Sequence, residues 1–283
     1  MKIKHKMPVL NCAGIPLVTD SPLVMGIINI TPDSFFDESR KQTVDEVLFQ
    51  AEKMLQDGAS ILDVGGQSTR PGSILIDTDE ELNRVIPIVA ALKTRFAGTI
   101  ISVDTYNSKT AKLAVDAGAN MINDISGGLQ DEQMIATVGT LNVPYVCMHM
   151  RGNPVTMHQP ENLIYNDLIT DITDFFIKQN DLCKKAGIKD VILDPGFGFS
   201  KTISQNFQLV KRLKDFSVLN LPVLLGVSRK SSIAKTLNVT ASEALNGTTV
   251  LNTVGLVNGA SILRVHDVKE AMECVKLFNM MYR

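Results

Sequence analysis

Short apolar runs recur along the chain, and most are followed by a polar loop and a stretch with helical spacing. Eight runs are found, at Leu23–Ile30, Ser60–Val64, Thr99–Val103, Asn120–Ile122, Val143–Met148, Val191–Leu193, Val223–Val227 and Ser261–Val265. They are short and almost continuously apolar, which is typical of parallel strands covered on both faces. The pattern therefore predicts eight buried strands that alternate with helices.

The stretches between these runs carry apolar residues on one helical face and end at glycine. Val44–Gln56 is amphipathic and stops at Asp57-Gly58. Ala111–Ala117, Leu168–Ala186 and Ala244–Val257 end beside glycine in the same way. Repeated helix–glycine–strand junctions are typical of βα units with right-handed crossovers.

Eight βα units in a chain of 283 residues predict an α/β protein with a (β/α)8 barrel. A doubly wound open sheet is the alternative. Two weak strand signals around Gly14, within Val9–Asp20, predict a short N-terminal β-hairpin. No low-complexity segment or linker marks a boundary, so we expect a single domain over residues 1–283.

The composition is that of an ordinary globular protein, with 45% hydrophobic and 20% charged residues. A net charge of -2 argues against nucleic acid as a partner. No secretory signal and no apolar run long enough to span a bilayer are found, so we expect a cytoplasmic protein without a membrane partner. The cysteines form no CxxC motif, and Cys147 and Cys274 lie in apolar runs that predict buried thiols.

In a barrel of this kind, functional residues gather where the strands end. Each predicted strand is followed by a polar or charged group: Asn29, Gly65–Arg70, Asp104, Asn123-Asp124, Met148-His149, Asp194, Ser228–Lys230, and Arg264 with His266. Helix capping accounts for some polar residues at such places. It does not by itself account for eight of eight exits with several charges among them.

Two kinds of side chain stand at these exits. The cationic or potentially cationic ones are Arg70, Lys230, Arg264 and His266. The acceptors are Asp104, Asn123 and Asp194. Arginine binds phosphate oxygens bidentately, and a carboxylate can accept two parallel hydrogen bonds from an amino-lactam edge. The combination predicts a site for a phosphate or pyrophosphate ester of a heterocycle.

Other motifs do not fit their templates. Gly66–Arg70 lacks the second glycine of a nucleophile elbow, and Gly196–Thr202 lacks the spacing of a P-loop. The histidines show no HExxH spacing, so a catalytic zinc site is not expected. His149 is expected to be a hydrogen-bonded core histidine, and Phe35-Phe36 to be a binding surface.

Two long segments carry a family resemblance. Met25–Phe35 and Leu62–Gly72 resemble the two signatures of dihydropteroate synthases. The resemblance continues in order through Ser102–Thr105, Asn123–Gly127, Asp194–Phe199, Ser228–Ser231 and Arg264–Asp267. That family consists of (β/α)8 barrels. Its members join 6-hydroxymethyl-7,8-dihydropterin pyrophosphate to p-aminobenzoate in folate synthesis, and they are sulfonamide targets.

The resemblance implies a role for each matching residue. The pterin would be held by Asp104, Asn123, Asp194 and Lys230, with Met148 and Phe199 packed against its ring. Pyrophosphate would be bound by Thr69, Arg70, Arg264 and His266, and the p-aminobenzoate pocket would be formed by Phe35, Pro71 and Ser231. Asn29 would be a ligand of Mg2+, the implied cofactor. Chemistry would depend on Asn29, Arg70, Lys230, Arg264 and His266.

The resemblance also implies an SN1-like mechanism, loops Thr31–Arg40 and Gly66–Ser73 that close over the substrate, and a homodimer formed by the last barrel helices. The chain departs from the common family pattern at four places: Asp37-Glu38, where Asp-Gly is common, Gln67 for Glu, Ser73 for Ala, and Ser200 for Gly. Neither Gln67 nor Ser73 is expected to be a main ligand, so we expect altered loop polarity and retained activity.

Two other functions are compatible with parts of the pattern. A barrel that transfers a methyl group from methyltetrahydrofolate to a corrinoid protein would share the pterin acceptors. It would not need the basic groups of Thr69–Gly72 and Arg264–His266. A family member that binds without turnover would be expected to lose Asn29, Arg70, Lys230 or Arg264, and all are present.

Overall fold

A computed structural model describes residues 9–30, 37–67 and 76–282, with only the backbone for 37–43. Ten strands occur in this part of the chain: β1 (Leu10–Cys12), β2 (Ile15–Leu17), β3 (Leu23–Asn29), β4 (Ile61–Gly65), β5 (Ile100–Asp104), β6 (Met121–Asp124), β7 (Tyr145–Met148), β8 (Val191–Asp194), β9 (Leu224–Leu225) and β10 (Ile262–Val265). The helices are α1 (Asp37–Gln56), α2 (Thr78–Arg95), α3 (Ser108–Asp116), α4 (Met134–Leu141), α5 (Leu168–Ala186), α6 (Ile203–Lys211), α7 (Ser231–Leu237), α8 (Leu245–Val257) and α9 (Val268–Tyr282).

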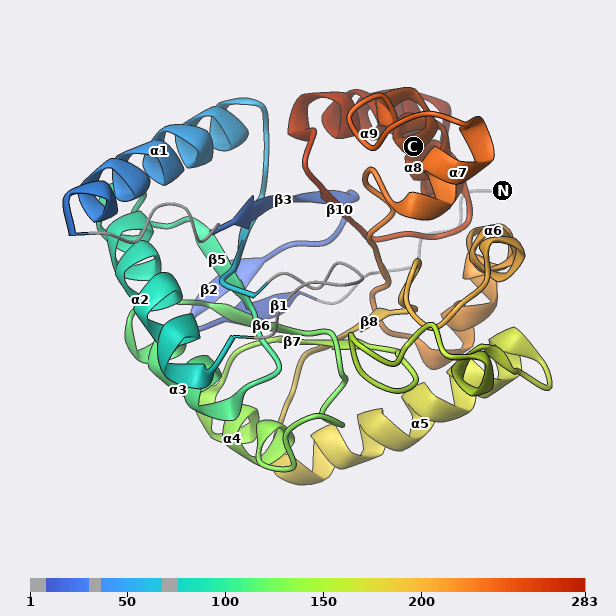
Figure 1. Cartoon of the computed structure of the whole chain (residues 1–283), viewed down its shortest axis with the longest axis horizontal. Coiled ribbons are helices and arrows are strands. Elements are labelled where there is room, and N and C mark those ends of the chain that lie inside the picture. The colour runs from blue at the N-terminus through green and yellow to red at the C-terminus, as the bar shows by residue number, and fades with distance from the viewer. Residues whose placement is uncertain (1–8, 31–36, 68–75, 283) are drawn as a thin grey trace.

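Strands β3 to β10 form one parallel sheet that curves into a barrel, and the helices surround it (Figure 1). The order along the sheet is β8-β7-β6-β5-β4-β3-β10-β9. A single bridge between Leu193 and Val223 links β8 to the residue before β9 and brings the two edges together. The (β/α)8 prediction is confirmed, and the open-sheet alternative is wrong.

The barrel interior has two layers of different chemistry. The lower layer is apolar and contains Met25, Ile61, Ile100, Met121, Val146, Ile192, Leu224 and Ile262. Because side chains alternate across a strand, the residues two or four positions further along point the same way. Those residues are Asp63, Asp104, Asn123, Asp194 and Arg264. A ring of polar side chains therefore lies above the apolar layer, at the carboxyl ends of the strands. This end of the barrel is here called the barrel mouth.

The predicted N-terminal hairpin is confirmed, and it closes the opposite end. β1 pairs antiparallel with β2, and Cys12 stands opposite Ile15. Ala13 and Gly14 turn the chain with φ of 52° and 87°, as the twist of a two-residue hairpin requires. Leu10, Cys12 and Leu17 pack against the lower barrel layer. The hairpin therefore covers apolar side chains that would otherwise face solvent.

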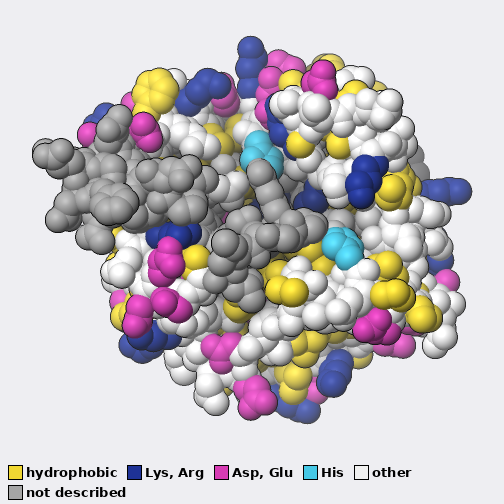
Figure 2. All heavy atoms as spheres, in the orientation of Figure 1, with side chains coloured by type: hydrophobic (Ala, Val, Ile, Leu, Met, Phe, Trp, Pro, Cys, Tyr) yellow, Lys and Arg dark blue, Asp and Glu magenta, His cyan; other side chains and the backbone are white. Residues whose placement is uncertain are grey.

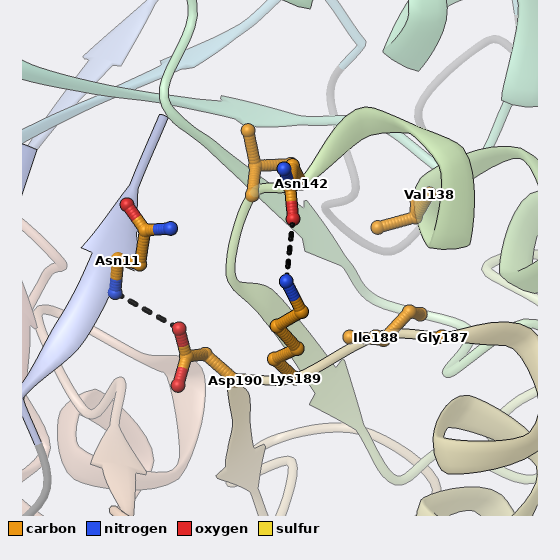
Figure 3. A pocket seen from close by; sticks show the side chains of 8 residues that line it. Asn11, Val138, Asn142, Gly187, Ile188, Lys189 and Asp190 are labelled. Atoms are coloured by element: carbon orange, nitrogen blue, oxygen red, sulfur yellow. Dashed lines mark hydrogen bonds between the residues drawn. The ribbon is translucent and has the colours of Figure 1, made fainter. Parts of the chain in front are cut away.

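A polar contact fixes the hairpin to the barrel. The backbone N–H of Asn11 donates to Asp190 Oδ2 at 2.9 Å, just before β8. Beside it, Lys189 donates to Asn142 (Figure 3). The cavity between these residues has a volume of about 10 Å³, enough for a single water molecule. This cavity is too small for a substrate.

The outer faces of the strands pack against the helices in one large core. Leu168–Ala186 forms α5 with the bounds that the pattern predicts, whereas α1 begins earlier, at Asp37. Helix α2 continues through Pro87, which would ordinarily interrupt a helix. Cys147 and Cys274 are buried free thiols, as expected. Among the described helices, none has the length and apolar character needed to cross a bilayer.

Candidate active site

The barrel mouth is centred on Arg264, which rises from the last strand between two carboxylates. Its Nε lies 2.6 Å from Asp63 Oδ2, and its Nη2 lies 2.6 Å from Asp104 Oδ2. Burial alone would lower the pKa of the guanidinium, but Asp63 and Asp104 more than offset it, so the pKa of Arg264 is raised. Arg264 is therefore a fixed cation across the working pH range.

Asp63 is a central residue that sequence reasoning did not assign to the site. It is fully buried, and its Oδ2 also accepts a hydrogen bond from Asn123 Nδ2 at 3.0 Å. Its Oδ1 is buried without a hydrogen-bond partner among the described residues. Asp63 lies inside an apolar run, where the pattern predicts only a strand residue. Its side chain lies on the same face of β4 as that of Ile61, two residues earlier, and this alternation could have revealed a carboxylate that points into the barrel.

Asp104 and Asn29 flank the same side of the mouth. Burial raises the pKa of Asp104 to about 7, against the opposing effect of Arg264 and with the help of Asp63. Asn29 is exposed at the end of β3. Gly65 lies between them, because a Cβ at Gly65 would stand 3.5 Å from Asp104 Cβ and 3.9 Å from Asn29 Oδ1. Because glycine has no side chain, space remains for a ligand between the carboxylate of Asp104 and the amide oxygen of Asn29.

Asp194 and Lys230 face the mouth from β8 and from the turn before α7. Asp194 Oδ1 accepts a hydrogen bond from the N–H of Gly196 at 2.8 Å, and burial raises its pKa. Lys230 Nζ lies 3.9 Å from the centre of the Phe199 ring, a cation–π contact. Burial lowers the pKa of Lys230 to about 8, although Asp194 opposes that effect. A carboxyl group, an ammonium group and an aromatic face thus meet within one part of the mouth.

Lys201 holds the turn that carries Phe199. Its ammonium is within hydrogen-bond distance of three acceptors, the carbonyls of Gly196 (3.1 Å) and Phe199 (3.0 Å) and His149 Nδ1 (3.2 Å). Burial lowers the pKa of Lys201 to about 7 and holds the pKa of His149 well below its usual range. His149 is buried and hydrogen-bonded, so the expectation of a core histidine is confirmed.

Ser200 adopts a backbone conformation that usually belongs to glycine. Its φ is 45°, and the residue is fully buried. The hydroxyl accepts a hydrogen bond from the N–H of Arg151 at 2.9 Å, and its carbonyl accepts one from the Tyr165 hydroxyl at 2.9 Å. These contacts offset the strain that a Cβ introduces here.

An apolar wall completes the described part of the mouth. Met148 and Phe199, which the sequence placed together, belong to one buried cluster with Ile125, Met150 and Met157. Methionine is flexible and polarisable, so such a wall can follow the flat face of a ring. Met148 and Phe199 thus share one buried apolar wall.

His266 and Ser231 lie on the remaining side. Ser228 Oγ lies 2.9 Å from His266 Nδ1 and also accepts from the His266 N–H at 3.1 Å. Arg229 makes a bidentate ion pair with Asp267, with both distances 2.8 Å. Ser231 is exposed at the start of α7. The segments after β9 and β10 are therefore joined beside the mouth.

Several predicted site residues lie outside the described residues: Phe35, Thr69, Arg70 and Pro71. The same holds for Ser73 and for most of the two loops expected to close. Gln67 is described: it is buried, and its Oε1 accepts from the N–H of Ile76 at 2.9 Å. That hydrogen bond links residue 67 to residue 76, the described residues on either side of the segment 68–75.

The described part of the mouth combines acceptors with cations. It brings together Asn29, Asp104, Asn123, Met148, Asp194, Phe199, Lys230, Arg264 and His266 at the strand ends. No group of three or more His, Cys, Asp or Glu side chains that could hold a metal ion occurs in the described ranges. On the face shown in Figure 2, the coloured acidic and basic side chains are interspersed, without a broad basic surface.

Comparisons with known proteins agree on one family. The family model described as "Pterin binding enzyme" matches residues 25–266. The chain is 42% identical over 266 residues to the dihydropteroate synthase of Escherichia coli (strain K12), covering 93% of each chain. A crystal structure of Yersinia pestis dihydropteroate synthase with a sulfonamide drug superposes with a TM-score of 0.89 at 39% identity, covering 97% of this chain and 98% of that one. The Xanthomonas albilineans enzyme with 4-aminobenzoic acid gives 0.88 at 35% identity, with the same coverage.

The low pKa of Lys201 has a consequence for stability. Folded Lys201 loses its proton near pH 7, whereas an unfolded lysine keeps it to about pH 10.4. Between these values the unfolded chain binds more protons, so the free energy of unfolding should rise with pH, by at most about 1.4 kcal/mol per unit. In Lys201→Met the free energy of unfolding should no longer increase with pH for this reason. Urea unfolding at pH 7, 8 and 9 measures the free energy of unfolding, with exposed Lys211→Met as the control. Parallel pH dependences for wild type and Lys201→Met would contradict the prediction.

Proposed function

The chain belongs to the dihydropteroate synthase family of pterin-binding enzymes, and we propose that the barrel mouth is where it carries out the family reaction. The enzyme is a transferase of folate synthesis. It joins 6-hydroxymethyl-7,8-dihydropterin pyrophosphate to p-aminobenzoate, giving 7,8-dihydropteroate and pyrophosphate. One observation supports the proposed location most: Arg264, Asp63 and Asp104 share the mouth with Asp194 and Lys230.

The pterin ring fits the acceptor side of the mouth. Asp194 would accept from the exocyclic amine and the adjacent ring N–H, since only one of its oxygens is used by Gly196. Asp104 and Asn123 would bind further ring positions, and Lys230 would bind a ring acceptor. Met148 and Phe199 would pack on the ring faces. This assignment gives Asp104, Asn123, Asp194 and Lys230 each a donor or acceptor that a pterin carries.

The chemistry is an exchange at the methylene carbon. Pyrophosphate leaves with the electron pair of the C–O bond, the electron-rich pterin carries the positive charge, and the arylamine then forms the C–N bond and loses a proton. Arg264 and His266 would stabilise the leaving anion, together with Arg70 and Thr69. The buried carboxylates would stabilise the cation. This SN1-like order suits an aniline, because a weak nucleophile gains from an already formed cation.

Mg2+ is the proposed cofactor. Asn29 presents an exposed amide oxygen beside the space that Gly65 leaves open, and oxygen is the ligand atom that Mg2+ prefers. A single protein ligand fits an ion that keeps several waters and binds substrate phosphates. When bound, the ion would neutralise charge on the departing pyrophosphate. Asn29 would orient it at the edge of the mouth.

The p-aminobenzoate site would lie beside Lys230, with Ser231 at the start of α7 and with Phe35 and Pro71 from the two loops. The X. albilineans relative was crystallised with 4-aminobenzoic acid, which supports a site for this substrate in the same fold. Loop closure would exclude water that could otherwise trap the cation. A corrinoid methyltransferase is disfavoured, because the relatives named above are dihydropteroate synthases.

We also propose that the enzyme is a homodimer. Helix α8 contains no charged residue, and three of its exposed residues are apolar: Val250 (53% exposed), Val254 (38%) and Val257 (50%). Their spacing places them on one helical face, and α9, which packs against α8, carries a further exposed apolar residue, Leu277. An uncharged apolar face of this kind suits a two-fold interface that pairs with itself.

Pyrophosphate release tests the function directly. The purified chain should release pyrophosphate from the dihydropterin ester only when p-aminobenzoate and Mg2+ are both present, in a coupled phosphate assay. Omission of p-aminobenzoate controls for hydrolysis of the ester. No release by a folded protein with both present would reject the proposal.

Asp194→Asn should weaken pterin binding between about tenfold and a hundredfold, because the amide offers a donor where an acceptor is needed. Calorimetric titration with the pterin ester measures the affinity. Asp174→Asn removes one exposed negative charge on α5 and serves as the control. Wild-type affinity in Asp194→Asn would show that this carboxylate does not bind the amino-lactam edge.

Val254→Glu should give a monomer, because it places a charge in the centre of the proposed apolar interface. Size-exclusion chromatography with light scattering determines the mass. Leu113→Glu changes another exposed apolar residue, on α3, and should leave the mass unchanged. A monomeric wild type, or a dimer in Val254→Glu, would contradict this interface.

A further inference from the structure

Asn206 is a buried amide on α6 that no sequence motif singled out. It is 1% exposed, and it lies between two segments that carry site residues. One segment is the turn from Gly196 to Phe199. The other is the first turn of α7, directly after Lys230.

Both ends of the Asn206 side chain are used. Oδ1 accepts a hydrogen bond from the N–H of Gly198 at 2.6 Å. Nδ2 donates to Ser232 Oγ at 2.9 Å and to the carbonyl of Lys201 at 3.4 Å. An amide has one acceptor end and one donor end, so Asn206 can bind both segments at once. Because Ser232 is also buried, water cannot easily replace its hydrogen bond.

Lys230 lies between the two segments that Asn206 joins. Its ammonium lies 3.9 Å from the centre of the Phe199 ring, on one segment. Its aliphatic part passes so close to Gly198 that a Cβ there would stand 2.9 Å from Lys230 Cδ. Its carbonyl accepts from the N–H of Ile233, in the first turn of α7. The position of Lys230 therefore depends on the separation of the two segments.

We propose that Asn206 is a positioning residue for the synthase reaction. It fixes the Phe199 turn and the start of α7 at one separation, and it thereby holds Lys230 against Phe199. The proposed pterin site uses Phe199 and Lys230, and the proposed p-aminobenzoate site uses Lys230 and Ser231, so one amide sets the alignment of both. This inference rests on the proposed function of the barrel mouth.

A purely structural role for Asn206 predicts a different result. In that case its loss would only destabilise α6, as would the loss of any other contact there. Thr202 provides the matched control, because its side chain caps α6 by accepting from the N–H of Gln205 at 3.2 Å. Thr202→Ala therefore weakens the same helix without removing a side-chain contact to Gly198 or Ser232.

Three variants separate these roles: Asn206→Ala, Ser232→Ala and Thr202→Ala. Two quantities are measured for each, the Kd for 6-hydroxymethyl-7,8-dihydropterin pyrophosphate by calorimetry and the KM for p-aminobenzoate by pyrophosphate release. The wild type is assayed first. If it bound neither substrate, the proposed function itself would fail, whereas results on the variants of an active wild type concern only Asn206.

Asn206→Ala should raise both the pterin Kd and the KM for p-aminobenzoate about tenfold, the loss expected for a buried hydrogen bond. Ser232→Ala keeps the Gly198 contact but loses the link to α7, so the KM should rise about fivefold and the pterin Kd should rise less, about threefold. Thr202→Ala should change neither and lower only the melting temperature.

Equal constants for Asn206→Ala and Thr202→Ala would overturn the proposal. If Asn206→Ala does not fold, Ser232→Ala decides, and an unchanged KM for p-aminobenzoate would overturn the proposal in that case as well.

Discussion

The pairing of Arg264 with Asp63 and Asp104 is the constraint on which the barrel mouth depends. A guanidinium and two carboxylates taken out of water cost several kcal/mol each unless they compensate one another. The two 2.6 Å contacts supply that compensation, and they span strands β4, β5 and β10. By the strand registers Arg264 pairs with Met25, a residue of the apolar layer, whereas Asp104 pairs with Gly65 at the end of β4. The long arginine side chain therefore reaches from near the apolar layer up to the two carboxylates, and the packing of that layer and of the hairpin below supports the polar half of the barrel.

The described charges of the mouth balance closely. Three carboxyl groups, those of Asp63, Asp104 and Asp194, face Arg264, Lys230 and Lys201. Burial raises the pKa of two of the carboxyl groups and lowers the pKa of both lysines, so it disfavours every one of these charges, and only the opposite charges beside them oppose this effect. A balanced mouth suits a neutral ring but has little positive charge left for a pyrophosphate. This is a physical reason for the proposed Mg2+ and for arginine from the loop that follows β4.

The sequence pattern predicted most of the fold, because periodicity reports directly which face of an element is buried. It also predicted the residues at strand exits, where a polar group interrupts an apolar run. It missed Asp63, which lies within a run, and Asn206, whose role depends on two segments that are distant in the sequence. Lys201 was missed for the same reason, since its partner His149 follows β7 and is distant in the sequence. The contacts of Asn206 and Lys201 arise from tertiary packing and leave no local signal in a single chain.

Two departures from the family pattern keep the geometry of the mouth by different means. Ser200 keeps a left-handed backbone because its hydroxyl and carbonyl both accept hydrogen bonds. Gln67 keeps an acceptor for the N–H of Ile76, as a glutamate would, but without a charge. Gln67 is buried, so a carboxylate at this position would have to give up its hydration, with the N–H of Ile76 as a hydrogen-bond donor. Because burial penalises a charge far more than a neutral amide, glutamine is the less costly residue here.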